Sequence, residues 1–247
     1  MKKKIIALLA GAMLTLCAAG NALANFDNGD LIRVVYNHAG TVEVATDLGS
    51  ISSLMSGTAA HTDAFSLSQI TGATSMSDLY VSYFAINSNT GWVGYNQSTA
   101  PVTGNRKFTS FTNAAGVVTP YYQTLGSGNQ VVADQTYTNA FSSRLIIGNI
   151  ASLNGYIPAG VEANLGALGS GGSVVQALYA FNNQGNLTGV TTGVHVNNAH
   201  GQQLLITTNA NGTTTVAPAA TPIPPAFLLM GSGLLGMVGI RRKINKA

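Results

Sequence analysis

The sequence predicts an all-β fold: a single antiparallel, β-sandwich-like domain over residues 25–217, with a signal peptide before it and one membrane helix after it. Three observations lead to this prediction. Short segments that alternate apolar and polar residues recur through the centre of the chain, separated by turn residues. About 193 central residues suffice for one domain with a substantial core. Each end carries an apolar run beside a cluster of basic residues.

The N-terminal end has the design of a secretory signal peptide. Lys2–Lys4 precede the apolar run Ile5–Ala19, and the small-residue triplet Ala22–Ala24 follows. We expect residues 1–24 to be removed by cleavage after Ala24; the alternative is an uncleaved anchor. Cys17 is the only cysteine of the chain and lies in this run. The domain that follows therefore has no disulfide and no thiolate chemistry.

The first expected hairpin starts shortly after this segment. Apolar and other residues alternate over Ile32–Tyr36 and again over Thr41–Val44, with the turn Asn37–Gly40 between them. This pattern predicts two antiparallel strands with one face in solvent. Glu43 is expected on that solvated face.

A second strand pair follows further along. Leu79–Ile86 is apolar on both faces apart from Ser82 and predicts a central strand. The residues Asn87–Gly91 then form a turn into the strand Trp92–Tyr95.

The last expected strands lie near the end of the domain. Val174–Phe181 is one of them, and Leu204–Thr207 and Thr213–Val216 form a further hairpin. Asn211-Gly212 between these two strands predicts a type I′ turn, since both residue types accept positive φ.

Other segments show weaker patterns. Ala64–Ile70 and Asn139–Ile147 each predict about two helical turns, and the glycine-rich stretch Gly155–Ser173 predicts a long surface loop. The hairpins resemble one another, but their spacing has no fixed period, so a β-solenoid is the second choice of fold.

The charge distribution excludes a nucleic-acid-binding protein. Only 8% of the residues are charged, against about a quarter in an average protein. Between residues 25 and 216, four basic residues face eight acidic ones, a net charge of −4, so the formal +3 of the whole chain comes from its ends. Such a domain lacks the clustered cations that displace counterions from phosphates.

No catalytic constellation is recognisable. The sequence has no Gly-x-Ser-x-Gly motif. A glycosidase needs two carboxylates close together in a cleft, and the chain has only two glutamates, Glu43 and Glu162, of which Glu43 is expected on a solvated strand face. We expect no enzymatic activity, and turnover abolished by replacing Glu162 would contradict this. Gly231–Gly236 matches a dinucleotide fingerprint but has neither a preceding strand nor a downstream acidic residue to bind a ribose, so helix packing in a membrane explains it better.

No metal or cofactor site is expected either. His195 and His200 lie five residues apart without a recognisable second ligand pair, and His38 and His61 stand alone in expected turns. Asp27–Asp30 offers oxygen ligands for calcium but is much shorter than a full loop motif. Capping of a turn before the first strand is the preferred explanation.

The C-terminal segment 218–247 combines a proline motif, an apolar helix and a basic end. The motif is Pro222-Ile223-Pro224-Pro225, and Arg241, Arg242 and Lys243 follow the apolar residues 226–240. A 15-residue helix rises about 22 Å, which is short but workable for a bilayer when basic side chains reach the interface. The basic residues act as a membrane stop on the cytoplasmic side; the alternative is a buried core helix.

This tail resembles the C-terminal sorting signal of the PEP-CTERM family, with a proline variant of the motif because Ile223 stands where the family has Glu. The start of the domain, Gly29–Tyr36, resembles only uncharacterised members. The resemblance implies a membrane sorting enzyme of the exosortase type as partner, passage through the inner membrane, cleavage near the motif, and delivery to the cell surface or an exopolysaccharide matrix.

Two functional hypotheses follow. The first is an exported structural or interaction protein of the cell surface or matrix. The alternative is a carbohydrate-binding module in which exposed rings stack on sugars, with Trp92, Tyr95, Tyr121 and Tyr122 as candidates. The competing explanation for these rings is that they fill the core. A secreted hydrolase is less favoured than either.

Overall fold

The computed structural model describes residues 26–57, 59–88, 90–96, 108–146, 161–182 and 202–219. Both predicted terminal segments lie outside these ranges, except for the first residues of 218–247. Within the described ranges, no helix combines the length and the apolar character needed to cross a membrane. The predicted helix over 226–240 is outside them and stays a prediction.

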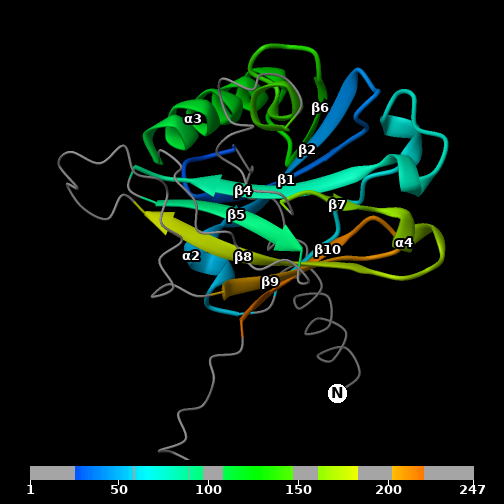
Figure 1. Ribbon diagram of the computed structural model, residues 1–247. Coiled ribbons are helices and arrows are strands. Elements are labelled where there is room, and N and C mark those ends of the chain that lie inside the picture. The colour runs from blue at the N-terminus through cyan, green and yellow to red at the C-terminus, as the bar shows by residue number, and fades with distance from the viewer. Residues whose placement is uncertain are drawn as a thin grey trace, which may run out of the picture.

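The described strands form one antiparallel sheet that curls (Figure 1). Its order is β3-β10-β9-β8-β5-β4-β1-β2-β6, with β7 paired to β4. The strands are β1 (Asp30–Tyr36), β2 (Val42–Ser50), β3 (Ala59–His61), β4 (Tyr80–Ile86), β5 (Thr90–Asn96), β6 (Gln130–Asp134), β7 (Ala163–Asn164), β8 (Val174–Asn182), β9 (Gln202–Thr208) and β10 (Thr214–Pro218). The all-β, antiparallel prediction is confirmed, but the strands belong to one continuous sheet and not to two facing sheets. Antiparallel pairing also differs from the parallel coils of a solenoid.

In the described part of the chain, few helices accompany the sheet. The longest is α3 (Phe108–Leu125), and α2 (Ile51–Leu54) and α4 (Gly166–Gly169) are single turns. Short helices of other types are η1 (Leu67–Gln69), η2 (Met76–Asp78) and η3 (Ser142–Ile146). The expected two-turn helices at 64–70 and 139–147 are thus reduced to η1 and η3.

The helix α3 covers one face of the sheet, which we call the helix face (Figure 1). Ala115, Val118 and Tyr122 recur at helical spacing and are fully buried against strand residues such as Phe84. This helix was not predicted from the sequence, because Gly116, Pro120 and several β-branched residues weaken the helical signal and none of its 18 residues is charged.

The opposite face, which we call the inner face, is closed by the curl of the sheet. Arg33 of β1 donates to Thr46 Oγ1 of β2 and to Thr214 Oγ1 of β10, both at 2.8 Å. Since β2 and β10 lie near opposite ends of the strand order, this side chain spans the curl. Its further donations go to the Gly212 and Asp63 carbonyls.

Both faces of the first hairpin are covered. The curl of the sheet closes the inner face, and α3 packs on the helix face. Strands β1 and β2 confirm the predicted hairpin, but Arg33 and Glu43 are both fully buried. The expectation that Glu43 is solvated was wrong, because α3 and the segment around Ser142 cover the helix face above it.

Two loops also differ from expectation. Phe26 is the only non-glycine residue with positive φ in the described ranges, so Asn211 does not adopt the type I′ conformation. Instead Asn209 and Thr213 close a three-residue loop in which Gly212 alone has positive φ (+79°). Residues 161–173 of the expected glycine-rich loop contain β7 and α4, whose neighbours Val161 and Leu165 are buried.

Candidate functional site

The four aromatic candidates for sugar stacking are not gathered in one place. Tyr95 and Tyr122 are fully buried, and Trp92 is only 8% exposed with Nε1 donating to Gln203 Oε1 at 2.7 Å. These three rings fill the core, as the competing explanation states. Tyr121 differs, because its ring is half-buried and lies at the surface of α3.

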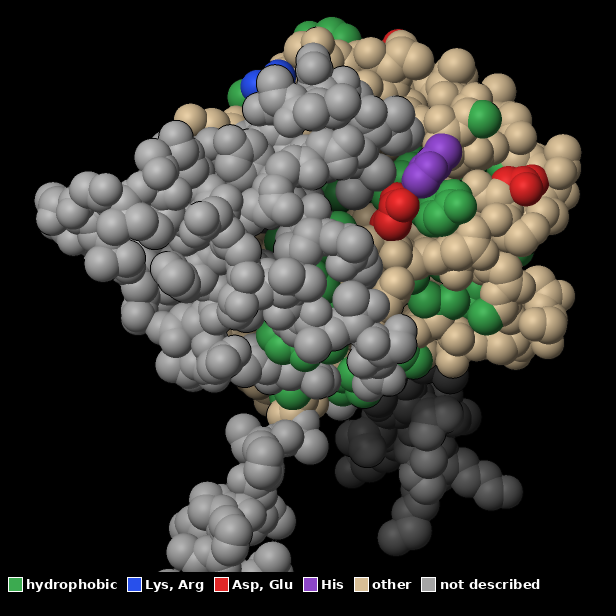
Figure 2. Space-filling view, in the orientation of Figure 1, with side chains coloured by type: hydrophobic (Ala, Val, Ile, Leu, Met, Phe, Trp, Pro, Cys, Tyr) green, Lys and Arg blue, Asp and Glu red, His purple; other side chains and the backbone are tan. Residues whose placement is uncertain are grey.

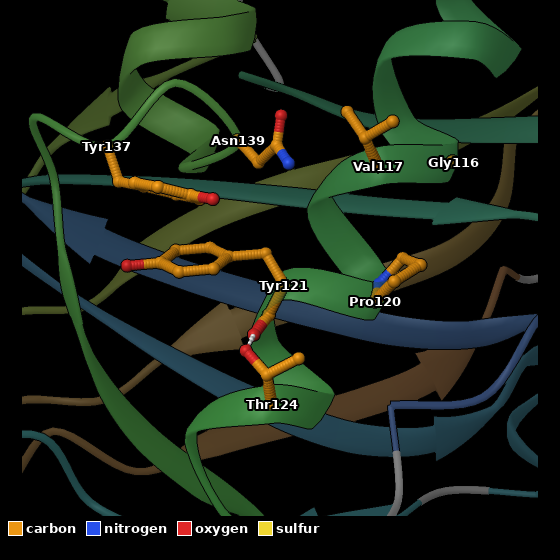
Figure 3. A pocket seen from close by; sticks show the side chains of 7 residues that line it. All are labelled: Gly116, Val117, Pro120, Tyr121, Thr124, Tyr137 and Asn139. Carbon is orange, nitrogen blue, oxygen red and sulfur yellow. Dashed lines mark hydrogen bonds between the residues drawn. The ribbon is translucent and has the colours of Figure 1, made fainter.

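Tyr121 lines a hollow of about 250 Å³ between α3 and the loop after β6 (Figure 3). Its ring stacks on that of Tyr137, with centroids 4.6 Å apart and planes inclined by 30°. Tyr137 is 49% exposed. The remaining lining residues are small or uncharged: Gly116, Val117, Pro120, Thr124 and Asn139. A shallow aromatic shelf of this kind suits the apolar face of a pyranose ring.

The strand β6 fixes the orientation of this shelf. The Tyr121 hydroxyl accepts from the Asp134 amide at 3.1 Å and donates to the Asp134 carbonyl at 3.3 Å. Partial desolvation, the largest cause, raises the pKa of Tyr121, so the hydroxyl stays neutral. The ring is therefore held in place before any ligand arrives.

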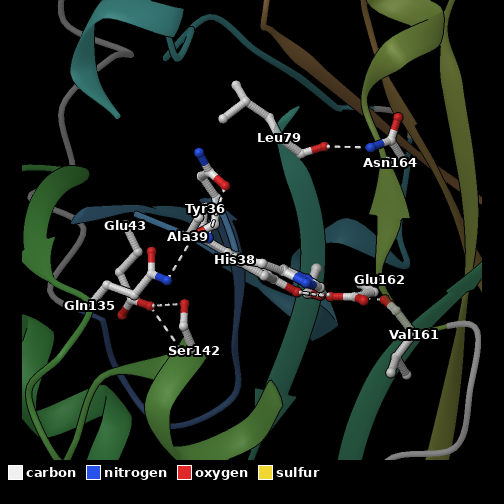
Figure 4. A network of polar contacts seen from close by, with 12 residues as sticks. Tyr36, His38, Ala39, Glu43, Leu79, Gln135, Ser142, Val161, Glu162 and Asn164 are labelled. Atoms are coloured by element: carbon white, nitrogen blue, oxygen red, sulfur yellow. Dashed lines mark hydrogen bonds and ion pairs between the residues drawn. The ribbon is translucent and has the colours of Figure 1, made fainter. Parts of the chain in front are cut away.

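A second cluster surrounds Glu162, which directly precedes β7 (Figure 4). Its Oε2 accepts from the Tyr36 hydroxyl at 2.6 Å and lies 2.9 Å from His38 Nε2. The His38 ring stacks on Tyr80 with centroids 4.1 Å apart. Burial first, and then the nearby Glu162 carboxylate, raise the pKa of Tyr36 well above its ordinary value.

The fold brings this cluster together from three distant segments. His38 lies in the turn after β1, which is fixed by the donation of Gln135 Nε2 to the Asn37 carbonyl. The Glu162 backbone carbonyl accepts from Asn96 Nδ2 of β5 at 2.9 Å. The pair could not be predicted from the sequence, since His38 and Glu162 are 124 positions apart in the chain.

The side chains of this cluster differ in their exposure to solvent. His38 and Glu162 are 43% and 27% exposed, whereas Tyr36 is fully buried. Figure 2 shows histidine beside acidic side-chain atoms on a surface with few other charges. The cluster offers an imidazole and a carboxylate to solvent. Ser82 also belongs to it, with its Oγ 3.2 Å from Tyr36 Oη, but this serine is buried.

Glu43 occupies a separate network with no residue in common with the Glu162 cluster. It accepts hydrogen bonds from Tyr122 Oη at 2.6 Å, Phe141 N at 2.8 Å, and Ser142 N and Oγ at 2.9 and 2.5 Å. Burial raises the pKa of Glu43, and these hydrogen bonds partly oppose the shift. Because no atom of Glu43 meets solvent, the residue joins α3 and η3 to the sheet and cannot act on a substrate.

The described residues contain no group of three or more side chains suited to hold a metal ion. Asp30 accepts from the Asp27 amide at 2.9 Å, which agrees with the expected capping of the turn. His61 lies on β3, while His195 and His200 are outside the described ranges.

The residues of the sorting signal, Pro222–Pro225 and Arg241–Lys243, also lie outside the described ranges. Comparisons of the chain with protein-family models, curated proteins and solved structures gave no significant match. Any functional conclusion therefore depends on the residues themselves.

Proposed function

We propose that this protein is an exported interaction protein of the cell surface or exopolysaccharide matrix, without catalytic activity of its own. The observation that carries the proposal is the exposed side of α3. That side consists of uncharged residues, including the 42%-exposed Leu125, and borders the aromatic hollow. The exposed side of α3 between Asn113 and Leu125 carries no charged residue, so it is a surface suited to contact rather than to solvation alone.

The distribution of charge inside the domain supports the same proposal. Arg33 and Glu43 are fully buried, and their hydrogen-bonding groups are directed at other parts of the fold. These two residues stabilise the sheet and its covering helix. At the surface, His38 and Glu162 contact each other.

The proposed route to the surface uses the two ends of the chain. A signal peptide over residues 1–24 directs export, and a sorting enzyme of the exosortase type recognises Pro222–Pro225 while 226–240 is held in the inner membrane. Arg241–Lys243 hold the tail on the cytoplasmic side.

Removing Pro222–Ala247 tests the route. The truncated protein should leave the membrane fraction and appear in the medium, whereas the full chain should be found with the envelope or matrix. A matched control keeps the whole tail but replaces Met55 by Ala, and its location should not change, since this exposed apolar residue lies at the end of α2 and not on α3. Identical fractionation of truncated and full-length protein contradicts the proposal.

A second candidate function, binding of a neutral polysaccharide, is favoured by the stacked pair Tyr121 and Tyr137. The outer ring is half exposed, the pair is fixed by β6, and Thr124 and Asn139 line the hollow beside it with groups able to bond sugar hydroxyls. The absence of charged side chains in the lining favours a neutral sugar over a uronic acid.

Affinity electrophoresis in gels that contain neutral polysaccharides tests this second candidate. Tyr137→Ala should weaken binding by up to about tenfold, since an aromatic contact contributes roughly 0.5–1.5 kcal/mol. Tyr121→Phe keeps the ring and should bind like the parent protein. Leu125→Ala removes exposed apolar surface from the same helix outside the hollow, so an equal loss in that control contradicts a site at the tyrosines.

A further inference from the structure

The helix α3 contains two residues that are poor helix formers, and both line the aromatic hollow. Gly116 and Pro120 lie about one turn apart on the exposed side of the helix. Pro120 lies beyond the middle of α3, far from the first turn in which a helix tolerates proline. In a helix interior proline is the least favourable residue and glycine the next. Neither residue belongs to the buried side of α3, so core packing does not account for them.

Pro120 changes the hydrogen bonding of the helix at the hollow. Each backbone carbonyl of an α-helix accepts from the N–H four residues later. Proline has no N–H, so the Gly116 carbonyl lacks its helical donor. This carbonyl points along the helix toward Pro120, within the stretch that lines the hollow. Gly116 is exposed, and a Cβ added to it would meet no side chain within 4 Å. A ligand in the hollow can therefore reach an acceptor that the helix does not use.

Other polar groups of the hollow also favour a ligand that donates hydrogen bonds. The Thr124 hydroxyl donates its proton to the Tyr121 carbonyl at 2.7 Å (Figure 3), so only its acceptor lone pairs remain for a ligand. The Asn139 amide and the Tyr137 hydroxyl can both accept and donate. The hollow thus combines two stacked rings with two groups that only accept, and its lining has no cationic side chain to attract an anion.

We propose that the hollow selects a neutral pyranose with unsubstituted hydroxyl groups, one of which donates to the Gly116 carbonyl that Pro120 leaves without its helical donor. This inference rests on the second candidate function, binding of a neutral polysaccharide, and adds the chemistry by which the sugar is selected. An O-acetyl or O-methyl group removes the hydroxyl donor and leaves the carbonyl unpaired in the complex, so substituted sugars bind more weakly.

The first experiment restores the missing helix bond and measures stability and sugar binding together. Pro120→Ala and Pro120→Val both supply an N–H for the Gly116 carbonyl, and valine also keeps apolar volume beside Tyr121. Both variants should melt several degrees above the parent protein. Both should bind the polysaccharide roughly five- to tenfold more weakly, as expected for one lost hydrogen bond. Parent-like binding by a folded Pro120→Val protein overturns the inference. A lower melting temperature together with weaker binding assigns the proline to the fold and overturns it too.

Asn113→Ala is the matched control for these variants. Asn113 is exposed on α3 but does not line the hollow, and alanine is a better helix former at this position as well. The control should raise the melting temperature slightly and leave sugar binding unchanged. Equal weakening in Asn113→Ala would assign the loss to a more stable helix rather than to the carbonyl, and it overturns the inference.

The second experiment changes the sugar. Affinity electrophoresis compares dextran, laminarin and a neutral galactan with an O-acetylated derivative of each. The protein should bind at least one of the neutral polymers, and roughly five- to tenfold more weakly after acetylation. Equal binding of a polymer and its acetylated derivative overturns the inference but leaves the site at Tyr121 and Tyr137 intact. No binding of any neutral polymer contradicts the second candidate function itself, and the inference with it.

Discussion

The two glutamates of the chain each accept a tyrosine hydroxyl at 2.6 Å, yet their surroundings are opposite. Glu43 is fully buried and receives three further hydrogen bonds from Phe141 and Ser142. Glu162 is 27% exposed and has His38 as its second side-chain partner. The same pair of residue types therefore connects α3 and η3 to the sheet in one region and forms a partly exposed surface cluster in the other.

The difference shows that burial and the number of donors decide the role of a carboxylate, rather than its nearest partner. Around Glu43 every donor belongs to the fold, so its removal leaves buried groups unsatisfied. Around Glu162, water can replace a lost partner on the exposed side. The comparison predicts unequal responses to matched substitutions.

The largest effect is expected for Glu43→Ala. Four donors would lose their acceptor inside the protein, and the free energy of unfolding should fall by about 3 kcal/mol or more. Urea unfolding followed by circular dichroism measures the loss. Glu162→Ala is the matched control, with an expected loss below about 1 kcal/mol. Equal losses would mean that the two sites do not differ as their burial indicates.

Removing the hydroxyl groups of Tyr122 and Tyr36 tests the same difference between the two glutamates. Tyr122→Phe should cost about 2 kcal/mol, because a buried carboxylate loses a donor that nothing replaces. Tyr36→Phe should cost about 1 kcal/mol, since Glu162 keeps His38 and contact with water. Thermal unfolding of both variants ranks the two losses of stability. A larger loss for Tyr36→Phe would contradict the assignment of Glu43 as the more enclosed carboxylate.

The pH dependence of the unfolding free energy is a further test of the burial of Glu43. Burial raises the pKa of Glu43 in the folded state above its unfolded value of about 4.3. The folded protein therefore binds this proton more tightly, and the contribution of Glu43 to stability falls as pH rises from about 4. Glu43→Gln should flatten this part of the profile of unfolding free energy against pH. An unchanged profile in Glu43→Gln would contradict this prediction.

The smallest effect is expected for the contact between His38 and Glu162. A double-mutant cycle with His38→Gln and Glu162→Gln should give a coupling energy of about 0.2–1 kcal/mol that decreases with added salt. A coupling that is large and independent of salt would show that the cluster is as well enclosed as Glu43.

Much of the strand pattern could be predicted from the sequence. Alternation identified β1 and β2, and the apolar run Leu79–Ile86 identified a central strand, since β4 lies between β1 and β5. The helix α3 escaped prediction because its glycine, proline and β-branched residues are poor helix formers, so packing of Val118 and Tyr122 on the sheet decides its structure. The stacked Tyr121 was among the candidate residues, but its partner Tyr137 was not.

Alternation and turn residues were enough to place seven of the ten described strands, whereas β3, β6 and β7 were not predicted. The burial of Arg33 and Glu43 and the contact between His38 and Glu162 depend on how the whole chain packs. Alternation and turn residues determine structure over a few neighbouring positions of the chain. Burial depends on distant parts of the chain, because it requires the curl of the sheet and a helix contributed by residues about 80 positions away from Glu43. A sequence pattern shows which side chains share a face of a strand, and the rest of the chain decides whether that face is covered.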